Sequence, residues 1–165
     1  MTLIDRPLAD STLLRKDGRY YLACYRVAPD LGAELWQAES LVGPWMQHPK
    51  SRKVNQSRRL RRCGGQWLQR DGRLFRVAQD CNGFYGKRVF RVPVEALTPE
   101  DYREGRAELL IDAASEPCGR KHTYNEIQTP QGKMVAEDVH HDVIYPVGML
   151  MRRIGRAIVK KFSAK

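Results

Sequence analysis

Polar side chains that could hold a small ligand gather near the middle of the chain. Gln79 and Asp80 end a predicted strand, and Tyr85 follows on the connecting loop, so an amide, a carboxylate and a phenol stand together. Such groups can orient a polar ligand through hydrogen bonds. The alternative is a plain turn in which Asp80 accepts hydrogen bonds from the loop backbone. The residue types leave both interpretations open.

A second candidate group lies just upstream of that loop. Arg61 and Arg62 precede Cys63 and the glycine pair Gly64-Gly65. Arginine can grip a phosphate or a carboxylate through two parallel hydrogen bonds. Paired glycines let the backbone approach another group closely. These residues therefore predict a place where an anionic ligand could be held.

Histidines and acids also gather near residue 140. In a strand, Asp138, His140 and Asp142 would share one face and offer an imidazole and two carboxylates to a metal. The segment falls where the last repeat of the chain ends, with no supporting shell of polar residues in the sequence. We therefore favour a solvated surface and predict neither a metal nor a cofactor.

The cysteines point away from metal and redox motifs. No pair has CxxC spacing, which zinc knuckles and thiol redox motifs require; the four are Cys24, Cys63, Cys81 and Cys118. Without a signal-like N-terminus we expect free thiols with a structural role. The same N-terminus predicts a cytoplasmic protein, and no run of 18 apolar residues predicts a membrane span.

The positive charge is unevenly spread along the chain. The formal net charge is +10, and eight basic residues with no acid fall between Glu39 and Asp71, most of them in the segment 50–62. A second basic block follows Asp142. Such blocks favour phosphates, nucleic acid or an acidic membrane as partners. A solvated loop and tail that only keep the protein soluble are the alternative.

The elements that would position these groups repeat along the chain. Three segments share a plan of strand, glycine turn and strand, and their turns fall at Gly18, Gly72 and Gly132. A hairpin repeat of about 40–60 residues predicts propeller blades, because a small sheet must stack on neighbours to bury its faces. A closed propeller has four to eight blades, so we expect an all-β, partial propeller-like fold of about three blades.

The remaining segments complete this plan. Residues 97–104 carry a short helix signal, since Thr98 can cap and Pro99 can start a helix. The third hairpin ends near Asp142 without outer strands, so we divide the chain into a partial propeller, 1–142, and a tail, 143–165. Apolar residues at helical spacing between Met151 and Phe162 predict a short basic amphipathic helix. That helix could cover an open sheet edge or lie on an acidic membrane.

Several of these motifs together resemble the N-terminal domain of the glucosamine inositolphosphorylceramide transferase family. The likeness rests on Arg-x-Cys-Gly-Gly, on the run from Asp71 to Cys81, on Tyr85-Gly86 and on His122-Thr-Tyr-Asn125. It covers about residues 61–138. The resemblance places His122 at the start of an innermost strand and adds His122 and Asn125 to the candidate ligand-binding residues.

The first repeat resembles blades of the family 43 glycoside hydrolases, which are five-bladed propellers. The likeness lies in Asp10 before the first hairpin and in the run from Ala38 to Trp45. It implies a partial five-bladed propeller fold associated with glycan chemistry, with Asp10 as a base and Asp80 as a second carboxylate. Family 43 enzymes have Asp-Pro where this chain has Asp10-Ser11, and no general acid is evident here. A hydrolase fragment is therefore an alternative function, since hydrolysis needs a full set of carboxylates.

Two classes of function follow from the sequence. The first is a carbohydrate or phosphosugar recognition domain related to glycosyltransferase-associated propellers and to glycan or glycolipid synthesis. The second is a non-catalytic interaction module whose basic loop and tail bind an acidic membrane, at whose periphery the protein would then lie, or nucleic acid. Nucleic acid is the weaker version, because residues 50–62 have no aromatics for base stacking. Open sheet edges also predict self-association.

Overall fold

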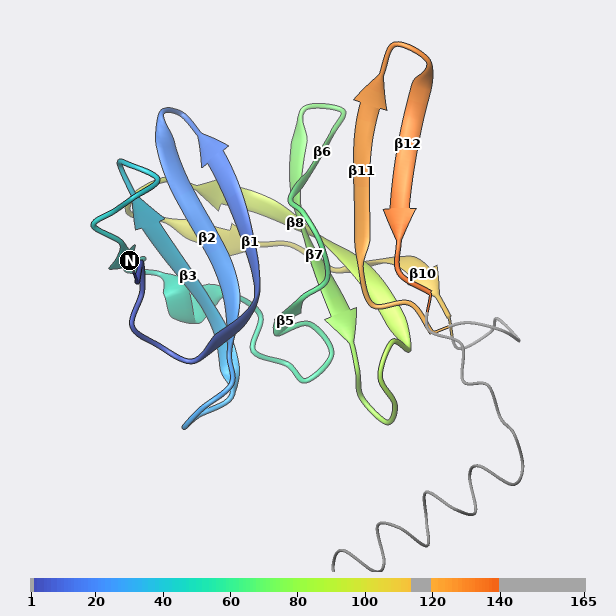
Figure 1. Ribbon diagram of the computed structural model, residues 1–165, viewed down its shortest axis with the longest axis horizontal. Coiled ribbons are helices and arrows are strands. Elements are labelled where there is room, and N and C mark those ends of the chain that lie inside the picture. The colour runs from blue at the N-terminus through green and yellow to red at the C-terminus, as the bar shows by residue number, and fades with distance from the viewer. Residues whose placement is uncertain (1, 114–119, 140–165) are drawn as a thin grey trace, which may run out of the picture.

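The chain folds into antiparallel sheets that fan out as the blades of a partial propeller (Figure 1). The structure is a computed structural model that describes residues 2–113 and 120–139. Its regular elements are twelve strands and one short 3₁₀ helix, η1, at Ser51–Lys53. The predicted all-β, propeller-like fold is therefore confirmed.

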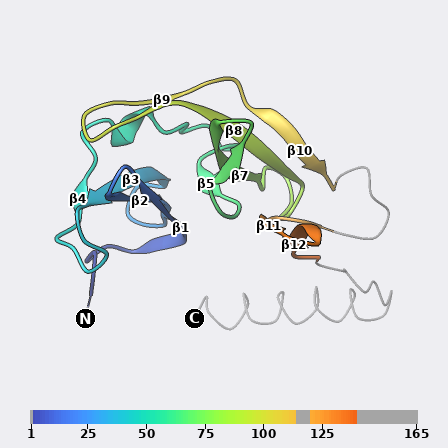
Figure 2. The same ribbon diagram turned by 90° about the horizontal axis from the view of Figure 1, so that it is seen from above.

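The first blade is a four-stranded sheet in simple meander order, β1-β2-β3-β4. Its strands are β1 (Leu8–Lys16), β2 (Arg19–Arg26), β3 (Gly32–Ala38) and β4 (Met46–Gln47). β3 is buried along its whole length, because the basic segment after β4 and the second blade cover it. β1 lies on the inner side of the fan, as the view from above in Figure 2 shows.

The second blade is built around two long central strands. β7 (Arg73–Asp80) pairs with β8 (Arg88–Leu97), and the shorter strands flank them. β5 and β6 pair with β7 on the inner side, and β9 and β10 pair with β8 on the outer side. The flanking strands are β5 (Arg62–Cys63), β6 (Leu68–Arg70), β9 (Tyr102–Glu104) and β10 (Glu108–Asp112).

The third blade consists of two strands in the described part of the chain. β11 (Tyr124–Thr129) and β12 (Gly132–Glu137) form a hairpin whose outer strand is almost fully exposed. Gly65 and Tyr124 form a parallel bridge that joins β11 to the second blade. A Cβ at Gly65 would overlap the Tyr124 carbonyl oxygen, so glycine is what lets the two inner strands meet.

The three hairpins turn where the sequence predicts. Asp17-Gly18 and Asp71-Gly72 all have positive φ, as the central residues of type I′ turns do. Gly132 also has a positive φ, of 125°. We call this side of the molecule the hairpin end. The opposite side, the loop end, carries three connections, residues 27–31, 57–61 and 81–87, at the bottom of Figure 1.

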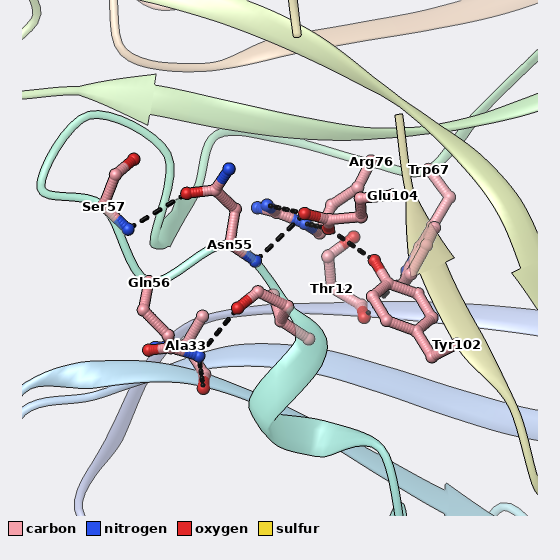
Figure 3. A network of polar contacts seen from close by, with 10 residues as sticks. Thr12, Ala33, Asn55, Gln56, Ser57, Trp67, Arg76, Tyr102 and Glu104 are labelled. Carbon is pink, nitrogen blue, oxygen red and sulfur yellow. Dashed lines mark hydrogen bonds and ion pairs between the residues drawn. The ribbon is translucent and has the colours of Figure 1, made fainter. Parts of the chain in front are cut away.

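A buried polar network joins the first two blades beneath the basic segment (Figure 3). Arg76 is fully buried, and its guanidinium donates to the Glu104 carboxylate at 2.6 Å. The Tyr102 hydroxyl donates to Glu104 from one side, and the Asn55 backbone N–H donates from the other. Because the charged pair is enclosed and hydrogen-bonded, it fixes the middle of the basic segment, at Asn55, against the second blade.

Apolar side chains fill the space around that network. One cluster links the first two blades and includes Tyr21, Leu35, Trp67 and Tyr102. A second cluster lies between the second and third blades and includes Phe75 and Tyr124. Each blade therefore buries its faces against its neighbour, which is the physical reason for the radial arrangement.

The short helix expected at 97–104 does not form. β8 continues through Leu97, and Thr98 Oγ1 accepts hydrogen bonds from the N–H groups of Glu100 and Asp101 as a cap would. The chain then returns as β9, because Tyr102 pairs with Leu97 and becomes fully buried. Burial of Tyr102 thus outweighs the local helix signal. The expected tail helix lies outside the described residues.

Candidate functional site

A cleft opens between the inner strands of the three blades. Its volume is about 400 Å³, and its walls come from the first half of β1, the glycine segment after β5, the end of β7 and the start of the third blade. Four of the eight residues that the sequence predicts as ligand-binding line it, namely Asp10, Gln79, His122 and Asn125. Pieces of chain more than 100 residues apart thus meet at one place.

Asp10 sits at a break in the regular pairing of β1. The register between β1 and β2 shifts between Ala9 and Thr12, and Asp10 has a φ of 52°. A left-handed backbone is uncommon for a residue other than glycine and is held in place by surrounding structure. A bulge of this kind re-aims a side chain, and here the Asp10 carboxylate accepts a hydrogen bond of 2.8 Å from Arg62 Nε.

Arg62 is held in position from several sides. Its guanidinium carbon lies 5.2 Å from the centre of the Tyr25 ring and 5.9 Å from that of Tyr85. Burial alone would lower the pKa of Arg62, but the hydrogen bond and charge of Asp10 raise it on balance. Its terminal nitrogens form no further hydrogen bond to the described residues. Arg62 is thus a fixed cation with unused donors.

Tyr85 extends this stack toward the third blade. Its ring packs against the His122 ring with centroids 4.4 Å apart. Tyr85 is 41% exposed, so one side of the ring remains open to solvent. Partial burial raises the pKa of its hydroxyl, while the nearby Arg62 opposes that rise. The phenol therefore stays protonated at neutral pH and can donate a hydrogen bond.

His122 is oriented by a carboxylate. Its Nδ1 contacts Asp138, which also accepts from the backbone N–H groups of His122 and Thr123 and from the Thr123 hydroxyl. Burial raises the pKa of Asp138, but these hydrogen bonds outweigh it and lower the pKa on balance. An ionised Asp138 favours the proton of His122 on Nδ1, which leaves Nε2 as an acceptor. Nε2 has no hydrogen-bond partner among the described residues.

The two amides of the cleft hold its walls together. Gln79 Nε2 donates to the Cys63 carbonyl oxygen at 2.6 Å, and Gln79 is 1% exposed. Asn125 Oδ1 accepts from the Gln66 N–H at 2.9 Å, which ties the third blade to the second. Both residues line the cleft, but Gln79 Oε1 also accepts a hydrogen bond from Cys81 Sγ at 3.2 Å, so both polar atoms of that side chain are engaged.

Asp80 does not lie on the ligand groove, where the sequence predicts it. It is 1% exposed and does not line the cleft. Its carboxylate accepts from the Asn82 N–H at 2.9 Å and pairs with Arg59 Nε at 3.2 Å. The turn interpretation of Asp80 therefore describes its contacts. Arg61 also lies outside the cleft, with its guanidinium 5.5 Å from the centre of the Tyr25 ring.

The glycine pair and Cys63 serve the fold at this place. A Cβ at Gly64 would lie 3.0 Å from the His122 carbonyl oxygen, so the close approach is between parts of the chain itself. Cys63 is buried, and burial raises the pKa of its thiol to about 11. A thiol with such a pKa is not a nucleophile at neutral pH. Cys24, Cys63 and Cys81 are all free, as expected.

Residues 2–113 and 120–139 contain no group of three or more His, Cys, Asp or Glu side chains that could hold a metal ion. His140 and Asp142 of the expected cluster lie outside these residues, and Asp138 contacts His122 instead. None of the helical segments in the same residues has the length and apolarity to cross a bilayer.

Sequence reasoning missed two residues that shape the site. Tyr25 supports both Arg61 and Arg62 from the neighbouring strand, and it is 7% exposed. In the sequence, Tyr25 is one of several residues of a predicted strand and has no feature that marks a site. Asp138 was noticed only as a metal ligand, because its pairing with His122 depends on how β12 returns beside β11.

Comparison with known proteins places the whole described part of the chain in one family. The family model for the N-terminal region of glucosamine inositolphosphorylceramide transferase 1 matches residues 1–139. A protein of that name from Oryza sativa subsp. japonica is 34% identical over 120 residues, which covers 69% of this chain and 16% of the relative. One from Arabidopsis thaliana is 28% identical over 180 residues, covering 97% of this chain and 24% of the relative. The chain thus spans between a sixth and a quarter of these relatives.

Proposed function

The chain belongs to the family of glucosamine inositolphosphorylceramide transferase N-terminal domains, and from this we propose that its central cleft recognises a phosphorylated sugar. The family name connects the chain with glycolipid glycosylation. The name also contains an amino sugar, glucosamine, and a phosphorylated cyclitol, inositol phosphate. Inositol phosphate could supply both the ring and the phosphate that the cleft would bind, and glucosamine could supply a ring.

The observation that carries this proposal is the position of Arg62. Its guanidinium is fixed by Asp10, Tyr25 and Tyr85 beside the cleft that Asp10 lines, and its terminal nitrogens form no further hydrogen bond to the described residues. A pre-positioned guanidinium offers a phosphate two parallel hydrogen bonds without loss of side-chain freedom. The half-exposed Tyr85 ring and His122 Nε2 provide an apolar face and an acceptor for the sugar ring and its hydroxyls.

The same contacts favour recognition over hydrolysis. Glycoside hydrolysis uses two carboxylates on opposite sides of the scissile bond. Of the described residues that line the cleft, Asp10 is the one acid, and it is paired with Arg62. Asp80, the second expected carboxylate, is enclosed by its own turn. The cleft therefore suits a ligand-binding role better than the family 43 chemistry.

Calorimetric titration tests the proposal with four probes: myo-inositol 1-phosphate, glucosamine 6-phosphate and the two unphosphorylated sugars. We expect the phosphorylated forms to bind more tightly. Arg62→Gln should weaken that binding by about 10–100-fold, since charge-assisted hydrogen bonds are lost. Arg15→Gln is the matched control, because Arg15 also stacks on a tyrosine, Tyr20, but lies beside the Gly18 turn, away from Asp10.

Two outcomes would contradict the proposal. One is equal affinity of the wild-type protein and the folded Arg62→Gln variant for the phosphorylated probes. The other is binding that disappears in about 0.5 M salt, because a diffuse surface attraction is screened whereas a shaped site is much less so. Circular dichroism confirms that each variant is folded before titration.

A further inference from the structure

The loop end of the molecule combines exposed apolar side chains with unpaired positive charge. Leu31 is 52% exposed and Val27 is 41% exposed in the connection between β2 and β3. Phe84, 36% exposed, lies in the connection between β7 and β8. Both connections project from the same side of the fan (Figure 1).

Most of the positive charges at this end lack an acidic partner among the described residues, the exception being Arg59, which pairs with Asp80. The three connections 27–31, 57–61 and 81–87 contain four basic residues and one acid, Asp30. Arg58, Arg61 and Lys87 form no ion pair with the described residues, and Lys87 Nζ instead lies 5.9 Å from the centre of the Phe84 ring. At the hairpin end, by contrast, Lys16 pairs with Asp17 and Arg19 pairs with Glu39. The loop end thus presents three basic side chains that have no acidic partner among the described residues.

We propose that the loop end docks onto an anionic lipid bilayer, with Leu31 and Phe84 inserted among the head groups and the basic residues above them. Apolar residues ringed by lysine and arginine are the combination that binds an acidic membrane surface. Exposed aromatic rings suit the interface, where one face meets lipid and the other meets water. A strictly electrostatic partner such as nucleic acid would leave the apolar side chains unexplained.

Docking by the loop end also determines which way the cleft faces. The proposed docking does not depend on phosphosugar binding. Asp10, Arg62 and His122 come from the loop-end halves of β1, β5 and the third blade. Docking by the loop end therefore turns the cleft toward the membrane. Head groups, rather than soluble sugars, would then be the nearest ligands.

The first experiment measures how the full chain partitions into vesicles by sedimentation. Vesicles of phosphatidylcholine with about 30% phosphatidylserine should bind it, and pure phosphatidylcholine should bind weakly. The double variant Leu31→Ser/Phe84→Ser should lower the partition coefficient at least tenfold. Arg58→Gln/Lys87→Gln should lower it about thirtyfold. The matched control is Leu41→Ser/Val42→Ser, which changes two apolar residues in the connection between β3 and β4 that are 47% and 63% exposed, and it should have no effect.

A second experiment separates docking by the loop end from binding through the basic tail. A tryptophan introduced by Phe84→Trp should be quenched by brominated lipids, whereas one introduced by Val42→Trp should not. Equal partitioning of the Leu31→Ser/Phe84→Ser variant and the wild type would overturn the proposal. Vesicle binding without quenching of the F84W fluorescence would also overturn it. Binding to single-stranded DNA in the absence of vesicle binding would do the same. An Arg62→Gln variant that still binds vesicles would show that docking is independent of the cleft.

Discussion

Asp80 ends β7 with its carboxylate enclosed by the turn that follows. Asp80 is 1% exposed, accepts a hydrogen bond from the Asn82 N–H and pairs with Arg59, so its removal takes away both contacts and leaves a small buried gap. We predict that Asp80→Ala lowers the free energy of unfolding by about 1–3 kcal/mol, measured by urea denaturation. Asp30→Ala, at an exposed loop position, is the control and should change it by less than about 0.5 kcal/mol. An unchanged stability of Asp80→Ala would contradict this account.

The residue scale also shows what one sequence can and cannot predict about a site. The run from Gln79 to Tyr85 and the position of His122 mark the correct neighbourhood, because polar residues at strand ends gather where the inner strands meet. The orientation of Asp80 could not be predicted, since an acid before a turn serves a ligand or its own backbone with the same local sequence. Tyr25 gave no signal, because its role depends on the register between β1 and β2.

At the scale of the elements, one ion pair joins the second and third blades. Arg70 of β6 donates to Glu126 of β11, and the Tyr124 hydroxyl donates to the same carboxylate at 2.7 Å. The hydrogen bond from Arg70, followed by that from Tyr124, lowers the pKa of Glu126 to about 2 from its ordinary value of 4.5, despite partial burial. A lowered pKa means that the ionised form stabilises the fold.

The pH dependence of this pair has a definite sign. The stabilisation is complete above pH 4.5 and is lost as the pH falls from 4.5 toward 2. We therefore predict that Glu126→Gln is less stable than the wild type at pH 7, and that the difference shrinks between pH 4.5 and 2. Urea denaturation of both proteins at several pH values measures the difference. A gap that stays constant over this range would argue against the pair.

Element by element, the sequence predicts hairpins better than it predicts connections. The three glycine turns and the hairpin of β11 and β12 follow from alternation and turn chemistry, which are local. The strand at Tyr102–Glu104 was missed, because the signal at Thr98 and Pro99 is local as well and favours a helix. The strand is favoured by tertiary contacts that the local sequence does not show: Tyr102 is buried in the core and its hydroxyl donates to Glu104.

At the scale of the whole molecule, the third blade leaves an apolar surface open. Ile127 and Met134 face each other across β11 and β12, and each is 62% exposed. In the described residues β12 has no neighbour on its outer side. An unpaired edge beside apolar side chains favours pairing with another chain.

We therefore predict concentration-dependent self-association of the protein, measured by sedimentation velocity. Met134→Lys should shift the equilibrium toward monomer, because a charge on an edge strand opposes edge-to-edge pairing. Leu41→Lys adds the same charge to a similarly exposed residue in a connection, and it should leave the association unchanged. A wild-type protein that is monomeric at every concentration would remove the basis of this prediction.

The parallel bridge between Gly65 and Tyr124 gives the cleft a property beyond its shape. One wall, with His122 and Asn125, belongs to a hairpin that meets the rest of the molecule through this bridge, the apolar packing of Tyr124, the Arg70 pair and a few hydrogen bonds. Such a unit can detach locally at a free energy well below that of global unfolding. The apparent affinity of any ligand then scales with the fraction of molecules in which the hairpin is docked. A partner that holds the hairpin in place, such as a neighbouring blade, would therefore raise the affinity of the cleft for its ligand without contacting that ligand.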